Sequence, residues 1–234
     1  MLFLKSMGFK KFMRIISSIF LVVLIFSNSI SKPKYSFGLY CGGGISKNII
    51  TSNIGKPNYF AVPAISVGLN AEAKISKNWG FKIDPNYLKL GYSYNITFTD
   101  LNGKVLSKDK LNVSLNYFQI PLLVKYSFGK KVKYFVNAGL YFGYLYKYSY
   151  TTENDFQTFM NSNSKLNSTD YGLTSGIGLT FNSEKKLGFN VELRNNLGFM
   201  NLSDVYNVYD AKNKNFSFLL NFGIKYNFGV TSEK

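Results

Sequence analysis

The stretch "NFSFLLNFGIKYNFG", residues 215–229, alternates apolar and polar side chains with a period of two. Its even-numbered positions, from Phe216 to Phe228, are aromatic or branched aliphatic, whereas the positions between them are mostly Ser, Asn, Gly and Lys. Successive side chains of a β-strand point to opposite faces of a sheet. The stretch therefore predicts a strand with one oily face and one polar face.

The same alternation recurs in three other segments of this 234-residue chain, which contains 22 Phe, 18 Tyr and only 5 Pro. That composition favours extended structure. None of the shared apolar positions is charged, and a soluble monomer could not expose so large an apolar surface to water. The predicted faces comprise Ile65, Val67, Leu69, Ala71, Ala73 and Ile75; Leu88, Leu90, Tyr92, Tyr94, Ile96 and Phe98; and Tyr171, Leu173, Ser175, Ile177, Leu179 and Phe181, among which only Ser175 is polar.

Two of the predicted strands change the parity of their apolar positions part-way along. Apolar positions are odd-numbered up to Ile83 and even-numbered from Leu88, with Asp84 and Pro85 between them. In the segment 111–128 apolar positions likewise change from odd, up to Tyr117, to even, from Phe118, beside Pro121. A shift of one residue is typical of a β-bulge, where proline is also tolerated. We therefore expect a bulge in each of these strands.

Further strands are expected around 35–46, 133–150 and 187–200, which brings the total to eight. The connections alternate between long polar segments and brief turns such as "KNWG" and "SEKK". This pattern predicts an all-β fold, an eight-stranded antiparallel up-and-down transmembrane β-barrel over residues 32–234, in a bacterial outer membrane. The long connections would face the cell exterior, and they span 47–59, 99–110, 151–169 and 201–214.

A soluble lipocalin-like carrier of an apolar ligand is the alternative fold and function. Its apolar face would point inward, and its outer face would be rich in Lys and Glu. Here the polar face is instead mostly Gly, Ser, Thr and Asn, as "GLTSGIGLT" (172–180) shows. Small polar side chains suit a narrow lumen better than a solvated exterior, so the pattern favours the membrane barrel.

Residues 1–31 do not follow the strand pattern. Lys5, Lys10, Lys11 and Arg14 precede an uncharged apolar run over 15–26. A transmembrane helix is the alternative, but twelve residues span only about 18 Å at ~1.5 Å per residue, short of a hydrocarbon core of ~30 Å. The segment is therefore predicted to be a cleaved signal peptide.

The chain carries a net charge of +16, which falls to +12 once the four cations of residues 1–31 are removed. A basic chain raises the possibility of nucleic-acid binding. However, the lysines are scattered singly along strands and turns, and the chain carries an export signal. We expect no nucleic-acid partner, and expect affinity for outer-membrane lipid and lipopolysaccharide instead.

Histidine is absent from the whole chain. Without it the usual general base and most zinc sites are missing, so we predict no enzymatic activity, no catalytic residues, no metal and no cofactor. Glu153 and Asp155 form an acidic pair, but a solvated loop explains them. The single cysteine, Cys41, permits no internal disulfide.

Charged residues on the predicted polar faces form a hypothetical luminal network. Two interpretations remain open: opposite charges that pair and fill a barrel too narrow to conduct, or a lumen that opens or contacts a ligand. The candidate residues are Glu72, Lys74, Lys89, Glu192, Arg194 and Lys225.

The stretches "LNYFQIPLLVKYSFG" (115–129), "YFVNAGLYFGYLYKYS" (134–149), "DYGLTSGIGLTF" (170–181) and "FLLNFGIKYNFG" (218–229) together resemble the PorT-like outer-membrane β-barrel family of Bacteroidetes. The resemblance implies an eight-stranded barrel with its assembly signal in the last strand, hence the barrel-assembly machinery as a partner. It also implies a structural or interaction role, with a secretion partner for some members. One departure is that the chain continues past Phe228 through "GVTSEK".

Overall fold

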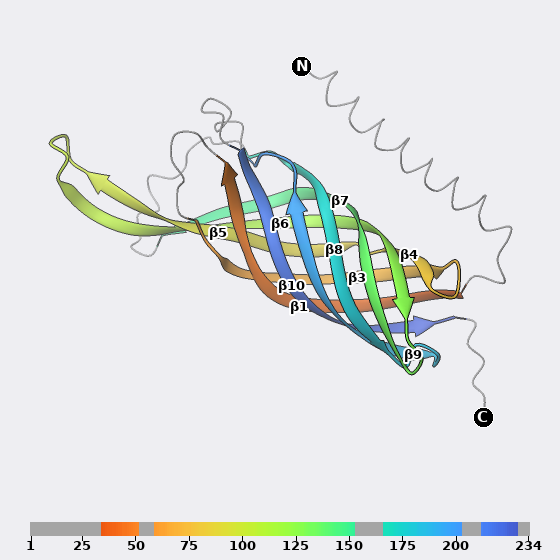
Figure 1. The fold of residues 1–234 in the computed structure, drawn as a ribbon. Helices are drawn as coiled ribbons and strands as arrows, with labels where there is room; N and C mark the ends of the chain where they lie inside the picture. The colour runs from red at the N-terminus through yellow and green to blue at the C-terminus, as the bar shows by residue number, and fades with distance from the viewer. Residues whose placement is uncertain (1–33, 52–58, 153–165, 203–211, 229–234) are drawn as a thin grey trace, which may run out of the picture.

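The computed structural model describes residues 34–51, 59–152, 166–202 and 212–228 (Figure 1). The predicted signal peptide, residues 1–31, lies outside them and stays a prediction, as do the acidic residues Glu153 and Asp155. In the described part of the chain, no helix has the length and apolar character needed to cross a bilayer.

Every strand of the described chain pairs antiparallel with its neighbours. The segments are β1 (Lys34–Thr51), β2 (Tyr59–Phe60), β3 (Val62–Lys74), β4 (Trp79–Ile83), β5 (Asn86–Thr99), β6 (Val105–Phe128), β7 (Val132–Thr152), β8 (Thr169–Phe181), β9 (Leu187–Gly198) and β10 (Lys212–Asn227).

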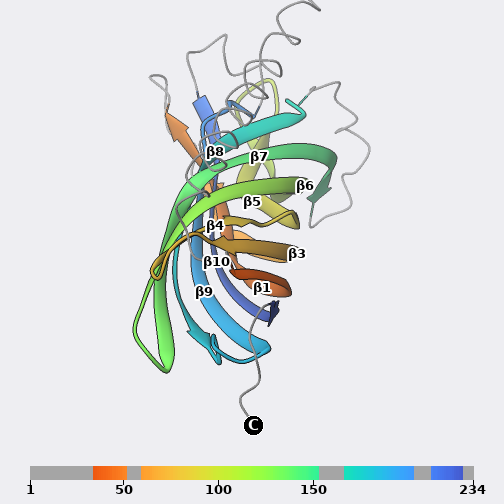
Figure 2. The same ribbon diagram turned by 90° about the vertical axis from the view of Figure 1, so that its right-hand side faces the viewer.

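These segments close into a ring of eight strands. Segments β4 and β5 pair with β3 on one side and with β6 on the other in one unbroken register, so together they form one barrel strand. The ring closes where β1 pairs with both β10 and β3. The predicted eight-stranded antiparallel barrel is confirmed, and Figure 2 shows the strands wrapping around it.

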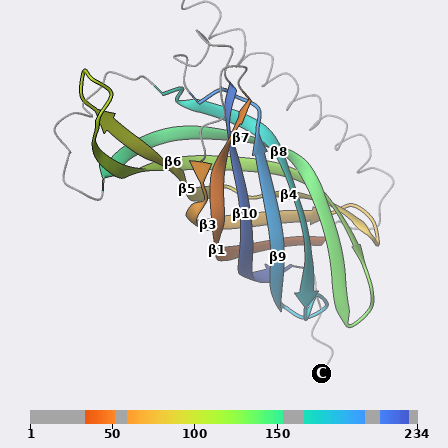
Figure 3. The same cartoon turned by 60° about the vertical axis from the view of Figure 1, so that its left-hand side comes forward.

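One predicted long loop is instead a projecting hairpin. Segment β5 continues to Thr99 and β6 begins at Val105, so the connection is only 100–104 and not 99–110. The Asp100 carboxylate accepts hydrogen bonds from the amides of Asn102 (2.9 Å) and Lys104 (2.8 Å), which holds the tip in a tight turn. Figures 1 and 3 show this β5–β6 hairpin extending beyond the other strands.

The outer surface of the barrel carries a continuous apolar belt, and the interior is polar over the same height. Along β10 the side chains of Phe222 and Ile224 are 53% and 51% exposed, whereas those of Asn221 and Lys225 are 1% and 3% exposed. The apolar face of the closing strand therefore points outward, as the alternation predicts. A soluble carrier with an inward apolar face is not favoured.

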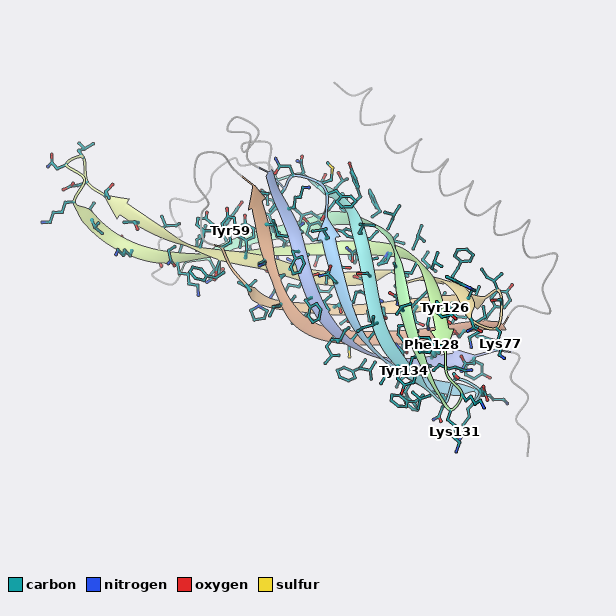
Figure 4. The ribbon with its side chains drawn as sticks, in the orientation of Figure 1. Tyr59, Lys77, Tyr126, Phe128, Lys131 and Tyr134 are labelled. Carbon is teal, nitrogen blue, oxygen red and sulfur yellow. The ribbon has the colours of Figure 1, made fainter. Side chains whose placement is uncertain are left out.

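Aromatic side chains gather at the end of the belt near the short connections. The rings of Trp79 and Tyr126 lie 4.9 Å apart, and those of Phe128 and Tyr134 lie 5.6 Å apart in a stacked arrangement. Figure 4 shows Tyr126, Phe128 and Tyr134 beside Lys77 and Lys131 at this end, with Tyr59 at the opposite end. Aromatic rows beside lysines are typical of a membrane interface.

The prediction that the apolar face beginning at Leu88 points outward is wrong for Leu88, Leu90 and Tyr92. Leu88, Leu90 and Tyr92 are buried inside the barrel, and Lys89 is exposed on the outside. Positions keep one parity through β4 and β5, because Lys82 and Asp84 also point inward. The expected bulge at Asp84–Pro85 is therefore absent from the register.

Strand β6 changes from an apolar inner face to an apolar outer face along the chain, whereas β4 and β5 change in the reverse order. Leu111, Val113 and Leu115 are buried in the interior, while Phe118 and Ile120 are exposed on the outer belt. The register passes Pro121 without a shift; the observed irregularities lie between Asn116 and Tyr117 and between Phe98 and Thr99. The expected bulge at Pro121 is thus also wrong.

The physical reason for both errors is that the barrel extends beyond the apolar belt. Within the belt apolar side chains point out and polar ones point in, whereas beyond it the walls meet water and the pattern inverts. The inversion occurs at the row formed by Lys89, Asn116 and Lys147, which are neighbours in register on β5, β6 and β7.

Candidate functional site

The interior near the short connections contains a charged cluster centred on Glu192 of β9. Its carboxylate accepts hydrogen bonds from Lys82 Nζ (2.9 Å), Asn137 Nδ2 (3.1 Å) and Arg194 Nε (3.0 Å). These donors come from β4, β7 and β9, so the cluster bridges the lumen. Each of these side chains is nine-tenths or more buried.

Arg194 and Lys82 also share a second carboxylate, that of Asp84. Lys82 Nζ lies 2.8 Å from Asp84 Oδ2, and the Arg194 guanidinium donates to the same oxygen. Arg194 further donates to the Tyr40 hydroxyl (3.2 Å) and lies over the Tyr40 ring. Two cations and two carboxylates thus compensate one another in a space closed to water.

A second cluster surrounds Glu72 of β3. Its Oε2 accepts hydrogen bonds from Lys125 Nζ (2.8 Å) and Lys225 Nζ (3.3 Å). Lys125 also lies 4.2 Å from the centre of the Phe135 ring, a cation–π contact. Lys74 is only partly buried, at the end of β3 two residues beyond Glu72.

Of the six predicted luminal residues, Glu72 and Lys225 lie in one cluster, Glu192 and Arg194 lie in the other, and Lys74 lies close enough to Glu72 for their charges to interact. Lys89 lies on the outer surface and is excluded from the network, because the strand has already left the apolar belt at that point.

Sequence reasoning missed Lys82, Asp84 and Lys125. The signal was present, since each alternates with outward apolar neighbours such as Phe81, Ile83 or Val124.

Glycines make room for these clusters. A Cβ on Gly176 would lie 2.6 Å from Glu192 Oε1 and 2.8 Å from Asn137 Oδ1. On the other side of the lumen, a Cβ on Gly42 would lie 2.0 Å from Asn221 Oδ1. Gly42 and Gly176 therefore serve close packing inside the barrel.

A layer of amides and hydroxyls contains a fourth buried carboxylate, that of Asp170. Asp170 Oδ2 accepts hydrogen bonds from the Tyr141 hydroxyl (3.1 Å) and Asn215 Nδ2 (2.9 Å). Asn215 also donates to the Tyr117 hydroxyl (3.0 Å), and Ser66 donates to Asn221 Oδ1 (2.6 Å). This layer links β3, β6, β7, β8 and β10 across the lumen.

Beyond these polar layers, towards the long connections, an apolar cluster fills the interior. Its members come from β3, β5, β6, β7, β10 and the connection after β9, with most of them on β5 and β6. They are Ala64, Leu88, Leu90, Tyr92, Leu111, Val113, Leu115, Tyr117, Leu145, Leu202 and Leu219. Opposite this cluster, Asn48, Asn213 and Ser217 are buried on β1 and β10, so this end of the interior has an apolar side and a polar side.

The charged groups in the interior near the short connections form ion pairs with one another. Among the described residues, no group of three or more His, Cys, Asp or Glu side chains is placed to hold a metal ion. Glu72, Asp84 and Glu192 are each within 3.3 Å of a lysine or arginine that points into the same space.

Comparisons with known proteins agree with this architecture. The family model described as "Outer membrane protein beta-barrel domain" matches residues 26–204. No curated protein matches the sequence.

Several solved structures are similar at low sequence identity. OprG from Pseudomonas aeruginosa is 14% identical, with a TM-score of 0.48 over 85% of this chain and 97% of that chain. The N-terminal β-barrel domain of OprF from the same organism is 12% identical, with a TM-score of 0.43 over 83% and 97%. Ail from Yersinia pestis, in complex with the heparin analogue sucrose octasulfate, is 13% identical, with a TM-score of 0.41 over 85% and 100%.

Proposed function

Because the chain belongs to the outer membrane protein β-barrel domain family, we propose that it is a non-enzymatic, non-conducting barrel that acts through its external surfaces. Its location is the bacterial outer membrane. The observation that carries the proposal is the filled lumen, in which two ion-paired clusters are followed by an apolar cluster.

The two parts of the lumen oppose ion flow for different physical reasons. The buried charges are engaged with one another, so an ion that entered would have to break pairs such as Lys82–Glu192. The aliphatic side chains of the apolar cluster beyond them have no polar atoms that could replace the water molecules around an ion. An eight-stranded barrel is only wide enough for side chains, so neither part has room to move aside.

Conductance in planar lipid bilayers tests this proposal. Purified, folded protein is expected to insert without producing steady current steps in 1 M KCl. Insertion is verified separately by protease protection of the same bilayers or vesicles. Reproducible single-channel steps from verified inserted protein would overturn the proposal.

The absence of histidine from the chain and the pairing of Glu72, Asp84 and Glu192 with lysine or arginine support a non-catalytic role. A general acid or base must exchange protons with a substrate within hydrogen-bonding reach. Glu72 and Glu192 instead face lysine and arginine side chains in a closed interior.

The projecting β5–β6 hairpin is the best-formed external surface for a partner. Leu101 at its tip is fully exposed, and Leu106 on β6 is also exposed. An ordered tip that presents an apolar side chain suits contact with another protein. The stretch Tyr117–Tyr126 and its resemblance to the PorT-like family support a secretion partner as the finer form of this proposal.

A photo-reactive amino acid at position 101 tests the interaction in the native membrane. Cross-linking to a distinct protein from Leu101, and not from a probe at Lys77 in a short connection, is the expected result. Cross-linking from Lys77 alone would move the interaction to the periplasmic side. No cross-link from either probe would oppose an interaction role.

A further inference from the structure

Two lysines lie side by side on the outer surface where the apolar belt ends. Lys89 on β5 and Lys147 on β7 both pair in register with Asn116 on β6, so all three point to the same face. Both lysine side chains are exposed. Because neighbouring strands are ~4.8 Å apart, the two lysines are separated by about 10 Å along the sheet.

Aromatic rings lie directly below this row, on the belt side. Phe118 and Tyr146 have ring centres 4.9 Å apart, and Tyr87 lies 6.3 Å from Phe118 and 6.1 Å from Tyr146. The Tyr87 hydroxyl donates to Asn116 Oδ1 (2.7 Å), and Asn116 Nδ2 donates to the Lys147 carbonyl (3.3 Å). The aromatic group and the polar row are therefore held together as one arrangement.

A β-bulge creates this arrangement. Asn116 pairs with Lys147 but Tyr117 pairs with Leu145, which leaves Tyr146 as the extra residue of β7. As a result Tyr146 and Lys147, although adjacent in sequence, are both exposed. Bulges commonly redirect side chains in this way.

The electrostatic surroundings favour an anion. The acidic residue of β4, β5, β6 and β7 is Asp109, and Asp84 lies in the link between β4 and β5; both are buried. Asp100 lies in the hairpin tip, where its carboxylate is bonded to backbone amides. The two lysines thus share a surface without a neighbouring outward carboxylate on these strands.

An apolar groove adjoins the aromatic group. It has a volume of about 1140 Å³ and includes Tyr87, Phe118 and Ile120 in its wall. From there it continues over β3, β1 and β10 past exposed side chains such as Leu69 and Phe222. A ligand that carries both phosphate and hydrocarbon could therefore contact the lysines and the groove at once.

We propose that Lys89 and Lys147, with the aromatic group below them, bind the phosphorylated headgroup of an outer-leaflet glycolipid whose acyl chains lie in the groove. Asn116 between them is only 8% exposed and is bonded to Tyr87 and Lys147, so it positions the row. The lysines supply charge-assisted hydrogen bonds to phosphate, and the rings pack against the sugar and the upper acyl segments. The occupant is a lipid and not a soluble anion, because the apolar wall is continuous with the polar row.

Native mass spectrometry of the full chain in detergent, with bis-phosphorylated lipid A as the probe, tests the proposal. The variant Lys89→Gln/Lys147→Gln is expected to bind this lipid about tenfold more weakly or worse, because each lysine near a phosphate contributes on the order of 1 kcal/mol. The matched control Lys130→Gln/Lys131→Gln removes two exposed charges from the opposite end and should change binding less than twofold.

Dephosphorylated lipid A should bind the wild type and both variants equally. Equal binding of the phosphorylated lipid to the wild type and the Lys89/Lys147 variant would overturn the proposal, as would an equal loss in the control variant. Full displacement of the lipid by millimolar inorganic phosphate would identify a simple anion site and would also overturn it.

Discussion

At the scale of single residues, the packing of the lumen depends on glycines, which leave room for the side chains opposite them. Gly176 on β8 faces Glu192 and Asn137, and any Cβ there would come within 2.8 Å of both side chains. Gly43 on β1 is the opposite case: it lies on the outer face, and a Cβ there would meet nothing closer than 3.8 Å. The two glycines form a matched pair for testing how tightly the interior is filled.

We expect Gly176→Val to lower the free energy of unfolding by about 1–3 kcal/mol, because the added atoms overlap a network that cannot move aside. Gly43→Val should change it by less than about 0.5 kcal/mol, since this position adjoins lipid and not another side chain. Urea titration of both variants in liposomes measures the difference. Equal effects at the two positions would contradict the filled-lumen description.

Glu192 provides a second test at this scale, because it compensates two buried cations. Glu192→Gln leaves Lys82 and Arg194 with Asp84 as their carboxylate partner, and breaking such a buried pair typically costs about 3–5 kcal/mol. Glu184, whose side chain is 79% exposed and lies 3.7 Å from Lys133, is the control. Glu184→Gln should shift stability by less than about 1 kcal/mol, as surface pairs do.

The same denaturation measurement distinguishes these outcomes. If Glu192→Gln were no more destabilising than Glu184→Gln, the Glu192 cluster would not be holding β4 and β9 together.

At the scale of strands, alternation in the sequence was sufficient to predict the barrel and the faces of β3, β8 and β10. It identified two faces everywhere, but not which face meets lipid, because an apolar side chain suits both a membrane and a dry interior. For Leu88 and Leu115 the interior is the correct choice, and only the placement of the belt reveals it. The luminal residues Lys82 and Lys125 were predictable from the same alternation, whereas the pairing partners of Glu72 depend on closure of the ring.

The inversion of faces along β6 can be tested with two outward positions on that strand. Ile120 lies within the belt, whereas Ser114 lies beyond Asn116 and its row. Trp79 is the only tryptophan, so Trp79→Phe gives a background in which a single new Trp is observed.

In liposomes that contain acyl-brominated lipid, Ile120→Trp should be strongly quenched and Ser114→Trp only weakly, since bromine atoms lie in the hydrocarbon. Leu220→Trp, on the outward face of β10, serves as a positive control. Similar quenching at 114 and 120 would place the membrane boundary beyond Ser114. The inverted faces of β5 and β6 could then not result from strands that extend beyond the membrane.

At the scale of the whole molecule, two solvents act on one closed sheet. Lipid surrounds the belt and selects a polar, ion-paired lumen inside it, while water surrounds the extended end and selects an apolar interior there. The same strands serve both regions without a break in register at Pro85 or Pro121. This arrangement distinguishes a membrane barrel from a soluble one more sharply than strand number does.

The single cysteine reports on this arrangement. Cys41 lies on the outward face of β1, between Leu39 and Gly43 and opposite Val67 and Phe222 on the neighbouring strands. In the membrane it should therefore be surrounded by lipid, where a charged, water-soluble maleimide cannot reach it. We expect native vesicles to show little labelling and urea-unfolded protein to be labelled completely, as measured by intact mass. A control variant moves the thiol out of the membrane. Cys41→Ser/Ser149→Cys places it at an exposed outward position beyond Lys147, where labelling of the native protein should be rapid. Rapid labelling of native Cys41 at the rate of this control would mean that the apolar face meets water, and the outer-membrane orientation of the whole barrel would then be untenable.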